Sequence, residues 1–387
     1  MNKQDIANIR KQFKVDNDKM KIHEIFNVYI MKESSDIYHQ QSQPFDMLDQ
    51  DEQELFITNF KKVLTGQLDE KLFELKFHAE TENPTQLILH KGLLAGENQE
   101  WQQQMLVIVE KILQDRQYEM DVVVTFIRGE YVKPMGRSQD DEGSIHDSVY
   151  AHPFILCSIN KTQDPKKELQ FDYIAKEFKY NVMVDPVINL NAPMGGFLFP
   201  CVTDNAQDVN HVLYTAGKAN EPDEAFIENV LEAEETMTAK DDKIAFEEVV
   251  RDAVGHQLNS STLANVYEEI HRVAEDNEEE EAPTLDYKDV ERILTSSGVA
   301  DVNTEKMEAA FQNVIDDTNY ELKARNIVPK FNSKSIKINT KVANISVSPE
   351  DLRHVRQIQM DGRRYLMIEV EEDTVIDGFT LIPEAFK

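Results

Sequence analysis

The chain contains little cysteine: its 387 residues include only Cys157 and Cys201, each inside an apolar run. A zinc site needs about four thiolate or imidazole ligands, usually with closely spaced pairs. Neither cysteine belongs to a CxxC or CxxxxH pair. The sequence therefore predicts two buried, reduced thiols that pack as small apolar side chains, and a reducing cytoplasm as their setting.

Long apolar runs are also missing. The opening segment MNKQDIANIRKQFK is polar and charged, and no stretch approaches the roughly 18 consecutive apolar residues of a membrane span. We therefore expect neither a signal peptide nor a membrane-spanning helix, and no membrane partner.

Motifs that identify common enzymes are lacking as well. The sequence has no GK[ST] phosphate-binding loop, no GxGxxG, no GxSxG and no HExxH, and its histidines are scattered singly. Adjacent carboxylates are frequent, but 72 acidic residues produce such pairs by composition alone. We therefore expect no metal and no cofactor, and the sequence favours a protein that is not an enzyme.

Charge is strongly one-sided, with 72 Asp and Glu against 41 Lys and Arg and a formal net charge of −31. Such a surface repels phosphate along most approaches, which argues against a broad nucleic-acid surface. It suits a protein partner, in particular a basic one.

The pattern of hydrophobic residues predicts an α+β fold. An N-terminal mixed sheet with flanking helices is expected over residues 1–207, followed by a helical region over 208–276. Residues 277–283 (NEEEEAP) read as an acidic linker. Two helices and then a small antiparallel β module are expected over 284–387, where Asp361-Gly362 is the turn of a hairpin.

Three places are candidates for chemistry or binding. Gly195-Gly196 precedes an aromatic strand, and as a turn its amides could hold an anion, or it could simply lead the chain into the strand. The polar segment 129–148 is expected to be a long exposed loop, and such loops are often functional. Asp141 and His146 in that loop, together with Cys201, would be the first candidates for a catalytic site beside Gly195-Gly196.

Arg363 and Arg364 follow the hairpin turn and form a small basic spot on an acidic chain. This spot is either a contact point for a partner or an offset to the neighbouring Glu369, Glu371 and Glu372 across the sheet.

Several strings together carry a family resemblance. They include NKQDIANIRKQFKVDNDKMKIHEIFNVYI, HPFILCSINK, APMGGFLFPCV, YKDVERILTSSGV and MDGRRYLMIEV. In order and from end to end, the sequence resembles a family of mostly Firmicute cytoplasmic proteins catalogued as domain of unknown function 4317. The resemblance implies one architecture over the whole chain and supplies no catalytic or ligand-binding residue.

The leading hypothesis is a non-enzymatic interaction or regulatory protein that binds a protein partner. A hydrolase or transferase with a site near the 129–148 loop and Gly195-Gly196 is the alternative. A weaker alternative is a ribosome- or nucleoid-associated factor that acts through a locally basic face.

Overall fold

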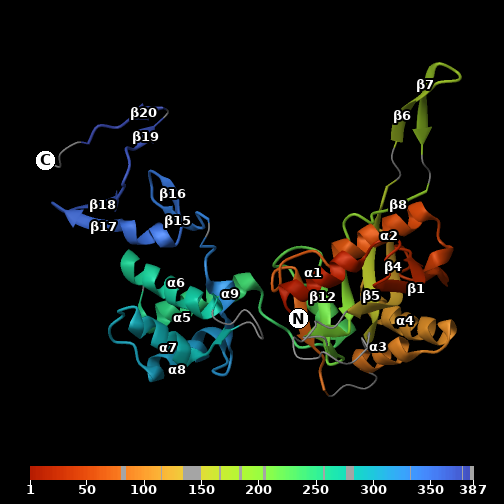
Figure 1. Ribbon diagram of the computed structural model, residues 1–387, viewed down its shortest axis with the longest axis horizontal. Helices are drawn as coiled ribbons and strands as arrows, with labels where there is room; N and C mark the ends of the chain where they lie inside the picture. The colour runs from red at the N-terminus through yellow and green to blue at the C-terminus, as the bar shows by residue number, and fades with distance from the viewer. Residues whose placement is uncertain are drawn as a thin grey trace, which may run out of the picture. The chain divides into compact units, whose positions relative to one another are not determined.

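The computed structural model describes residues 1–79, 84–114, 116–133, 150–164, 167–182, 185–203, 206–255, 258–275, 283–331, 333–376 and 378–383. The chain divides into two compact units, Met1–Thr238 and Ala239–Lys387 (Figure 1).

An eight-stranded sheet organises the first unit, with β2-β1-β4-β5-β9-β12-β3 as its order and β8 paired to β5. Its strands are β1 (Met20–Ile30), β2 (Ile37–Pro44), β3 (Leu72–Lys76), β4 (Val122–Lys133), β5 (Tyr150–Gln163), β8 (Val187–Ile188), β9 (Gly195–Phe199) and β12 (His211–Ala216). The predicted α+β class is confirmed. Within that class, every pairing between these strands is antiparallel, where we expected a mixed sheet.

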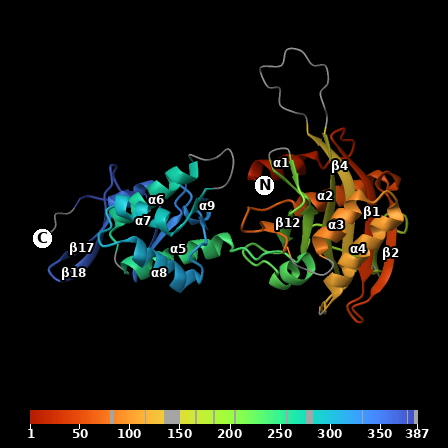
Figure 2. The same ribbon diagram turned by 90° about the horizontal axis from the view of Figure 1, so that it is seen from below.

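Helices cover both faces of the sheet, because successive strand residues point to opposite sides and both sets are apolar. One face is covered by α1 (Lys3–Gln12) and α2 (Gln50–Val63), the other by α3 (Thr85–Leu94), α4 (Asn98–Leu113) and the π-helical turn η2 (Phe226–Leu231) (Figures 1 and 2).

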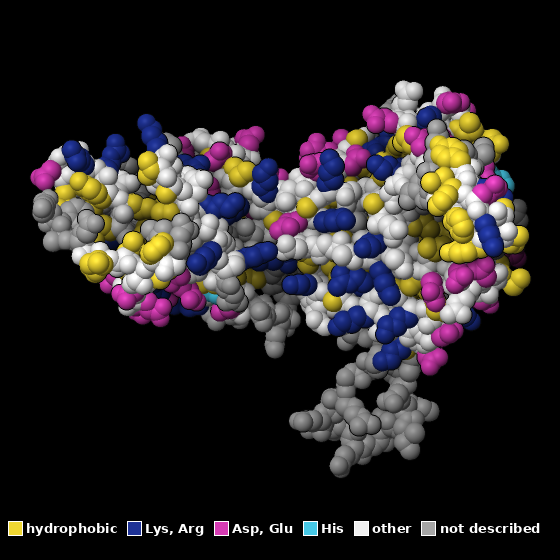
Figure 3. Space-filling view, turned by 90° about the horizontal axis from the view of Figure 1, so that it is seen from above, with side chains coloured by type: hydrophobic (Ala, Val, Ile, Leu, Met, Phe, Trp, Pro, Cys, Tyr) yellow, Lys and Arg dark blue, Asp and Glu magenta, His cyan; other side chains and the backbone are white. Residues whose placement is uncertain are grey.

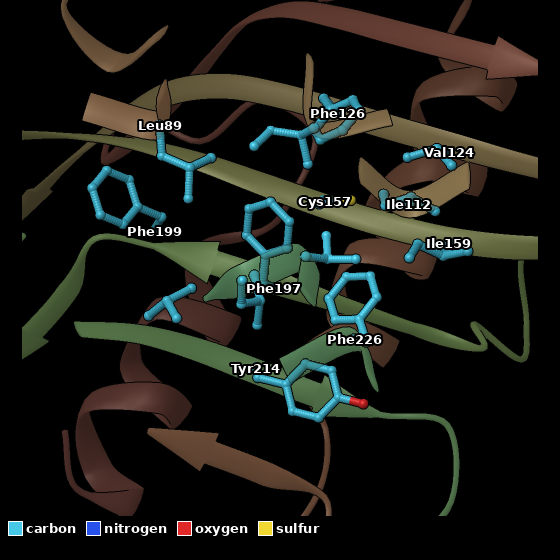
Figure 4. Packing of buried hydrophobic residues seen from close by; sticks show 14 of the residues in the cluster. Leu89, Ile112, Val124, Phe126, Cys157, Ile159, Phe197, Phe199, Tyr214 and Phe226 are labelled. Carbon is cyan, nitrogen blue, oxygen red and sulfur yellow. The ribbon is translucent and has the colours of Figure 1, made fainter. Parts of the chain in front are cut away.

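The alternation is clearest in β5. Cys157 and Ile159 belong to the core beneath α3 and α4, whereas Phe154 and Leu156 belong to the core beneath α1 and α2. Figure 4 shows aromatic and aliphatic side chains of the strands and of α3, α4 and η2 meeting in the first of these cores. Trp101 of α4 is fully buried there, with its ring centroid 6.1 Å from that of Phe26.

Local sequence explains where the helices begin. Asn2 and Asp49 are the N-caps of α1 and α2, each in a reciprocal capping box with the acidic residue three positions later. Helix α3 has no such residue, since Pro84 precedes it. Its N-terminus is capped from far away in the sequence, because the Glu232 carboxylate accepts hydrogen bonds from the Thr85 amide and from Lys111 Nζ, both at 2.7 Å.

Two parts of the first unit differ from the expectation. Residues 211–216 were expected in a helical region, but they form β12 between β9 and β3. Val212 and Tyr214 face one core, and Leu213 faces the other. Side chains that alternate between two cores in this way are typical of a strand and do not fit a helix. Residues 129–133, expected in an exposed loop, continue β4, because they pair with β1 or β5. The rest of that expected loop, 134–148, lies outside the described residues.

The second unit consists of helices followed by hairpins. The helices are α5 (Ala239–Val254), α6 (Ser260–Glu275), α7 (Tyr287–Ser296), α8 (Thr304–Ile315) and α9 (Ala324–Ile327). Strands β13 (Thr284–Leu285) and β14 (Leu322–Lys323) pair between them. Three two-stranded pairs follow: β15 (Ile336–Asn339) with β16 (Asn344–Val347), β17 (Val355–Met360) with β18 (Arg363–Ile368), and β19 (Val375–Ile376) with β20 (Phe379–Thr380). The carboxylate of Asp242 is fully buried and accepts hydrogen bonds from Tyr320 (2.7 Å) and Asn326 (2.6 Å), which joins α5 to α9.

We predict that Glu232→Gln lowers the free energy of unfolding by about 1–3 kcal/mol, because it leaves Lys111 and the α3 N-terminus without their anionic acceptor. Urea unfolding followed by circular dichroism measures the change. The matched control is Glu228→Gln, at an exposed position of the same turn, which should stay within about 0.5 kcal/mol of the unmodified protein. Equal losses in the two variants would contradict the capping role.

Candidate functional site

Gly195 and Gly196 are not a turn. They are the first residues of β9 and are buried, with Gly195 opposite Ile159 and Ala216 and Gly196 opposite Ser158 and Thr215. A strand paired on both sides uses its amides in the sheet, so the structure favours the second reading, a path into the strand, over an exposed anion cradle. Packing explains why position 196 is a glycine, because a Cβ there would lie 2.3 Å from the carbonyl oxygen of Cys157.

Both thiols are buried, on opposite faces of the sheet. Cys157 packs beneath α3 and α4, and Cys201, the first residue of β10 (Cys201–Thr203), packs beneath α1 and α2. Burial raises the pKa of each thiol well above its usual value. A nucleophilic thiolate needs a cationic and accessible setting, so Cys201 lacks the environment for the catalytic role considered above. Asp141 and His146 lie outside the described residues.

Arg363 and Arg364 lie where expected, at the start of β18 after a hairpin turn in which Asp361 and Gly362 both have positive φ (49° and 74°). Their cross-strand neighbours are Met360 and Gln359 rather than glutamates. Both arginines are exposed. The two arginines therefore do not serve to neutralise glutamates directly opposite them in the hairpin.

A cavity of about 240 Å³ lies between α1 and the end of β4. Asp5 and Tyr131 contribute polar groups to its wall, and the Tyr131 ring lies 5.1 Å from that of His152. Burial raises the pKa of Tyr131, and the Asp5 carboxylate closes the capping box of α1. Among the residues that the structure describes, no three His, Cys, Asp or Glu side chains are grouped to hold a metal ion.

The most exposed apolar surface of the first unit is a hairpin that projects beyond the main sheet, here called the arm (Figure 1). It consists of β6 (Lys167–Asp172) and β7 (Glu177–Val182). Six large apolar residues of the arm are each 41–96% exposed: Leu169, Phe171, Tyr173, Ile174, Phe178 and Tyr180.

The four apolar side chains on the strands of the arm share one face. Leu169 is opposite Tyr180, and Phe171 is opposite Phe178 with ring centroids 5.2 Å apart. Directly opposed residues of an antiparallel pair point to the same side. The intervening pairs, Gln170–Lys179 and Asp172–Glu177, therefore form a polar opposite face.

The tip of the arm is held by Asp172. Its carboxylate accepts hydrogen bonds from the amides of Ile174 (2.8 Å) and Ala175 (2.9 Å) and from Lys179 Nζ (2.7 Å). The hydrogen bond from Lys179, followed by the two amides, lowers the pKa of this carboxyl. The tip of the arm is therefore closed by hydrogen bonds between residues of the arm itself.

Sequence reasoning missed the arm, although a signal was present. Leu169 and Phe171 alternate with polar residues, and Phe178 and Tyr180 do the same, which is the period of a strand. The segment between them lacks the Asn-Gly or Asp-Gly pair that identifies a short hairpin turn.

Taken together, the first unit is an antiparallel sheet covered by helices on both faces, with an exposed apolar arm. The second is a helical unit with terminal hairpins, and in the described part of the chain no helix is long and apolar enough to cross a membrane. The chain belongs to the family described as Domain of unknown function (DUF4317), whose profile matches residues 1–379. This confirms the resemblance in the sequence. No curated protein and no solved structure matches the chain.

We predict that Gly196→Ala lowers the free energy of unfolding by about 2 kcal/mol or more, because the new methyl group must displace the β5 backbone. Gly96→Ala is the control, since a Cβ at Gly96 meets nothing within 4 Å. Urea unfolding measures both variants. A Gly196→Ala protein as stable as the Gly96→Ala protein would show that β9 and β5 are not as close as the structure places them.

We also predict that neither thiol of the native protein reacts with Ellman's reagent at pH 8 within the time in which both react in urea. Burial and the raised pKa values of Cys157 and Cys201 keep the thiolate population low. Rapid reaction of one thiol in the folded protein would restore Cys201 or Cys157 as a candidate nucleophile.

Proposed function

We propose that this protein is a cytoplasmic, non-enzymatic interaction protein that binds a protein partner through the apolar face of its arm. The partner is expected to present an apolar cleft bordered by basic residues. The observation that carries the proposal is the segregation of exposed apolar side chains to one face of the arm, opposite a polar face.

The size of the apolar surface supports binding. Each aromatic side chain can bury about 150–250 Å², and the arm exposes four of them. The accessible apolar area is therefore on the order of 500 Å², which is as large as the largest patch of a typical monomer and usually has a binding role. An isolated two-stranded hairpin is marginally stable in water, so a partner that covers the apolar face would also stabilise the arm.

Charge favours a separate protein over a second copy of the chain or an anionic membrane. The net charge of −31 repels both of these. The arm itself, residues 167–182, contains three lysines and three carboxylates, so it can enter an apolar cleft without net charge. The acidic remainder of the chain would then meet the basic border of the cleft.

The test compares two arm variants by affinity capture from a native lysate. Phe178→Thr/Tyr180→Thr removes two aromatic rings from the apolar face, and Gln170→Thr/Glu177→Thr changes the polar face. Threonine keeps a high strand propensity at all four positions. Because each buried aromatic ring contributes about 1.5 kcal/mol or more, the loss of two rings costs about 3 kcal/mol, and we expect the first variant to bind the partner at least about 100-fold more weakly.

The proposal requires one basic protein that is retained stoichiometrically by the unmodified chain and by the polar-face variant, but not by the apolar-face variant. Light scattering and vesicle flotation are run on the same proteins. Dimerisation or vesicle binding that depends on Phe178 and Tyr180 would overturn the proposal in favour of a second copy or a membrane. Equal capture by all three proteins would exclude the arm as the contact.

A further inference from the structure

A cationic groove lies between α1 and α2, on the face of the first unit away from α3 and α4. It is a shallow depression of about 450 Å³. Its lining consists of Arg10, Lys11, Lys14, Thr58, Lys61, Lys62 and Thr65. Figure 3 shows dark blue side chains gathered on this face.

Among the described residues that line the groove, five are cationic and none is a carboxylate, in a chain whose acidic residues outnumber its basic ones by 72 to 41. Asp16 and Asp46 line the neighbouring depression, which shares Lys14 with the groove. The groove is therefore a local cluster of positive charge on a chain with a net negative charge.

The negative C-terminal ends of the two helix dipoles offset part of this positive charge. Arg10 and Lys11 lie in the last turn of α1, and Lys61 and Lys62 in the last turn of α2. Arg10 also donates a hydrogen bond of 3.2 Å to the carbonyl of Leu64 just past α2. Two helix C-termini together offset only about one of the five positive charges, so roughly four remain to meet a ligand.

Helical spacing brings these side chains together. Thr58, Lys61, Lys62 and Thr65 follow the i, i+3, i+4, i+7 pattern of one side of α2, and Arg10 and Lys14 are four residues apart on and after α1. The two rows face each other across the groove, so an extended anion could contact cations on both sides.

We propose that the cationic groove binds the phosphodiester backbone of a nucleic acid and does so without reading base sequence. Clustered lysine and arginine side chains are the usual contacts to phosphate oxygens. The exposed Thr58 hydroxyl adds a neutral donor to the same wall. None of the described lining residues is aromatic, so they offer bases no surface on which to stack, and base recognition is not expected.

The narrowness of the groove favours a nucleic acid over an anionic membrane. A planar membrane would approach the acidic start of α2 as well, where Asp51, Glu52 and Glu54 are all exposed. A phosphodiester backbone fits within the strip of cations. At physiological ionic strength, charges more than about 8 Å apart are largely screened, so the acidic remainder of the protein opposes such a narrow contact only weakly.

The experiment measures fluorescence anisotropy of labelled RNA and DNA duplexes, each in two unrelated sequences, over a range of salt concentrations. The groove variant is Lys11→Glu/Lys62→Glu. The control with the same charge change is Lys91→Glu/Lys161→Glu, at exposed positions on α3 and β5 outside the groove. Circular dichroism melting shows that each variant is folded.

We expect binding at low salt that is similar for both sequences, at least about tenfold weaker in the groove variant, and within about twofold of the unmodified protein in the control. In a Lys11→Ala/Lys62→Ala protein, the slope of log K against log salt should fall in magnitude by about 1.8, which corresponds to two lost phosphate contacts on a duplex.

Three outcomes would overturn the proposal. The first is no binding of either duplex by the unmodified protein, and the second is equal weakening in the groove and control variants. The third is binding of phosphatidylglycerol vesicles or polyglutamate through the groove without binding of nucleic acid. Because the arm is unaltered in all of these proteins, this result is independent of the partner proposed for the arm.

Discussion

The first unit depends on burying both faces of its antiparallel sheet. Each central strand must supply apolar side chains to two cores at once, which explains the nearly continuous apolar sequence of β4 and β9. The same constraint brings the backbones of β5 and β9 so close that only glycine fits at position 196. It also places Cys157 and Cys201 in opposite cores, away from solvent and from each other.

This constraint decides where the protein can interact with other molecules. Most of the sheet is buried, and Gly195, Gly196 and Cys201, which the sequence offered as candidates for a site, are part of its packing. The surfaces with distinctive chemistry lie at the periphery of the unit: an apolar arm on one hairpin and a cationic groove between the two helices of one layer. These surfaces differ in chemistry and have no residue in common.

Much of the local structure could be predicted because its signals are local. Asp361-Gly362 forms a hairpin turn, as the sequence indicated. The caps Asn2 and Asp49 are equally local, because each pairs with a residue only three positions later. The cap of α3 could not be predicted, since its acceptor, Glu232, lies 147 residues beyond Thr85. Residues 211–216 were assigned to a helical region because their strand conformation depends on pairing with β9 and β3, which are distant in the sequence.

The sequence by itself determined the α+β class, the acidic balance and the family, because these follow from spacing, composition and sequence order. Only the tertiary structure decided that Gly195-Gly196 is an interior strand, that the apolar residues of 169–180 share an uncovered face, and that two separate basic stripes line one groove. The physical reason is that burial and charge clustering depend on which distant segments meet, and a linear pattern does not contain that information.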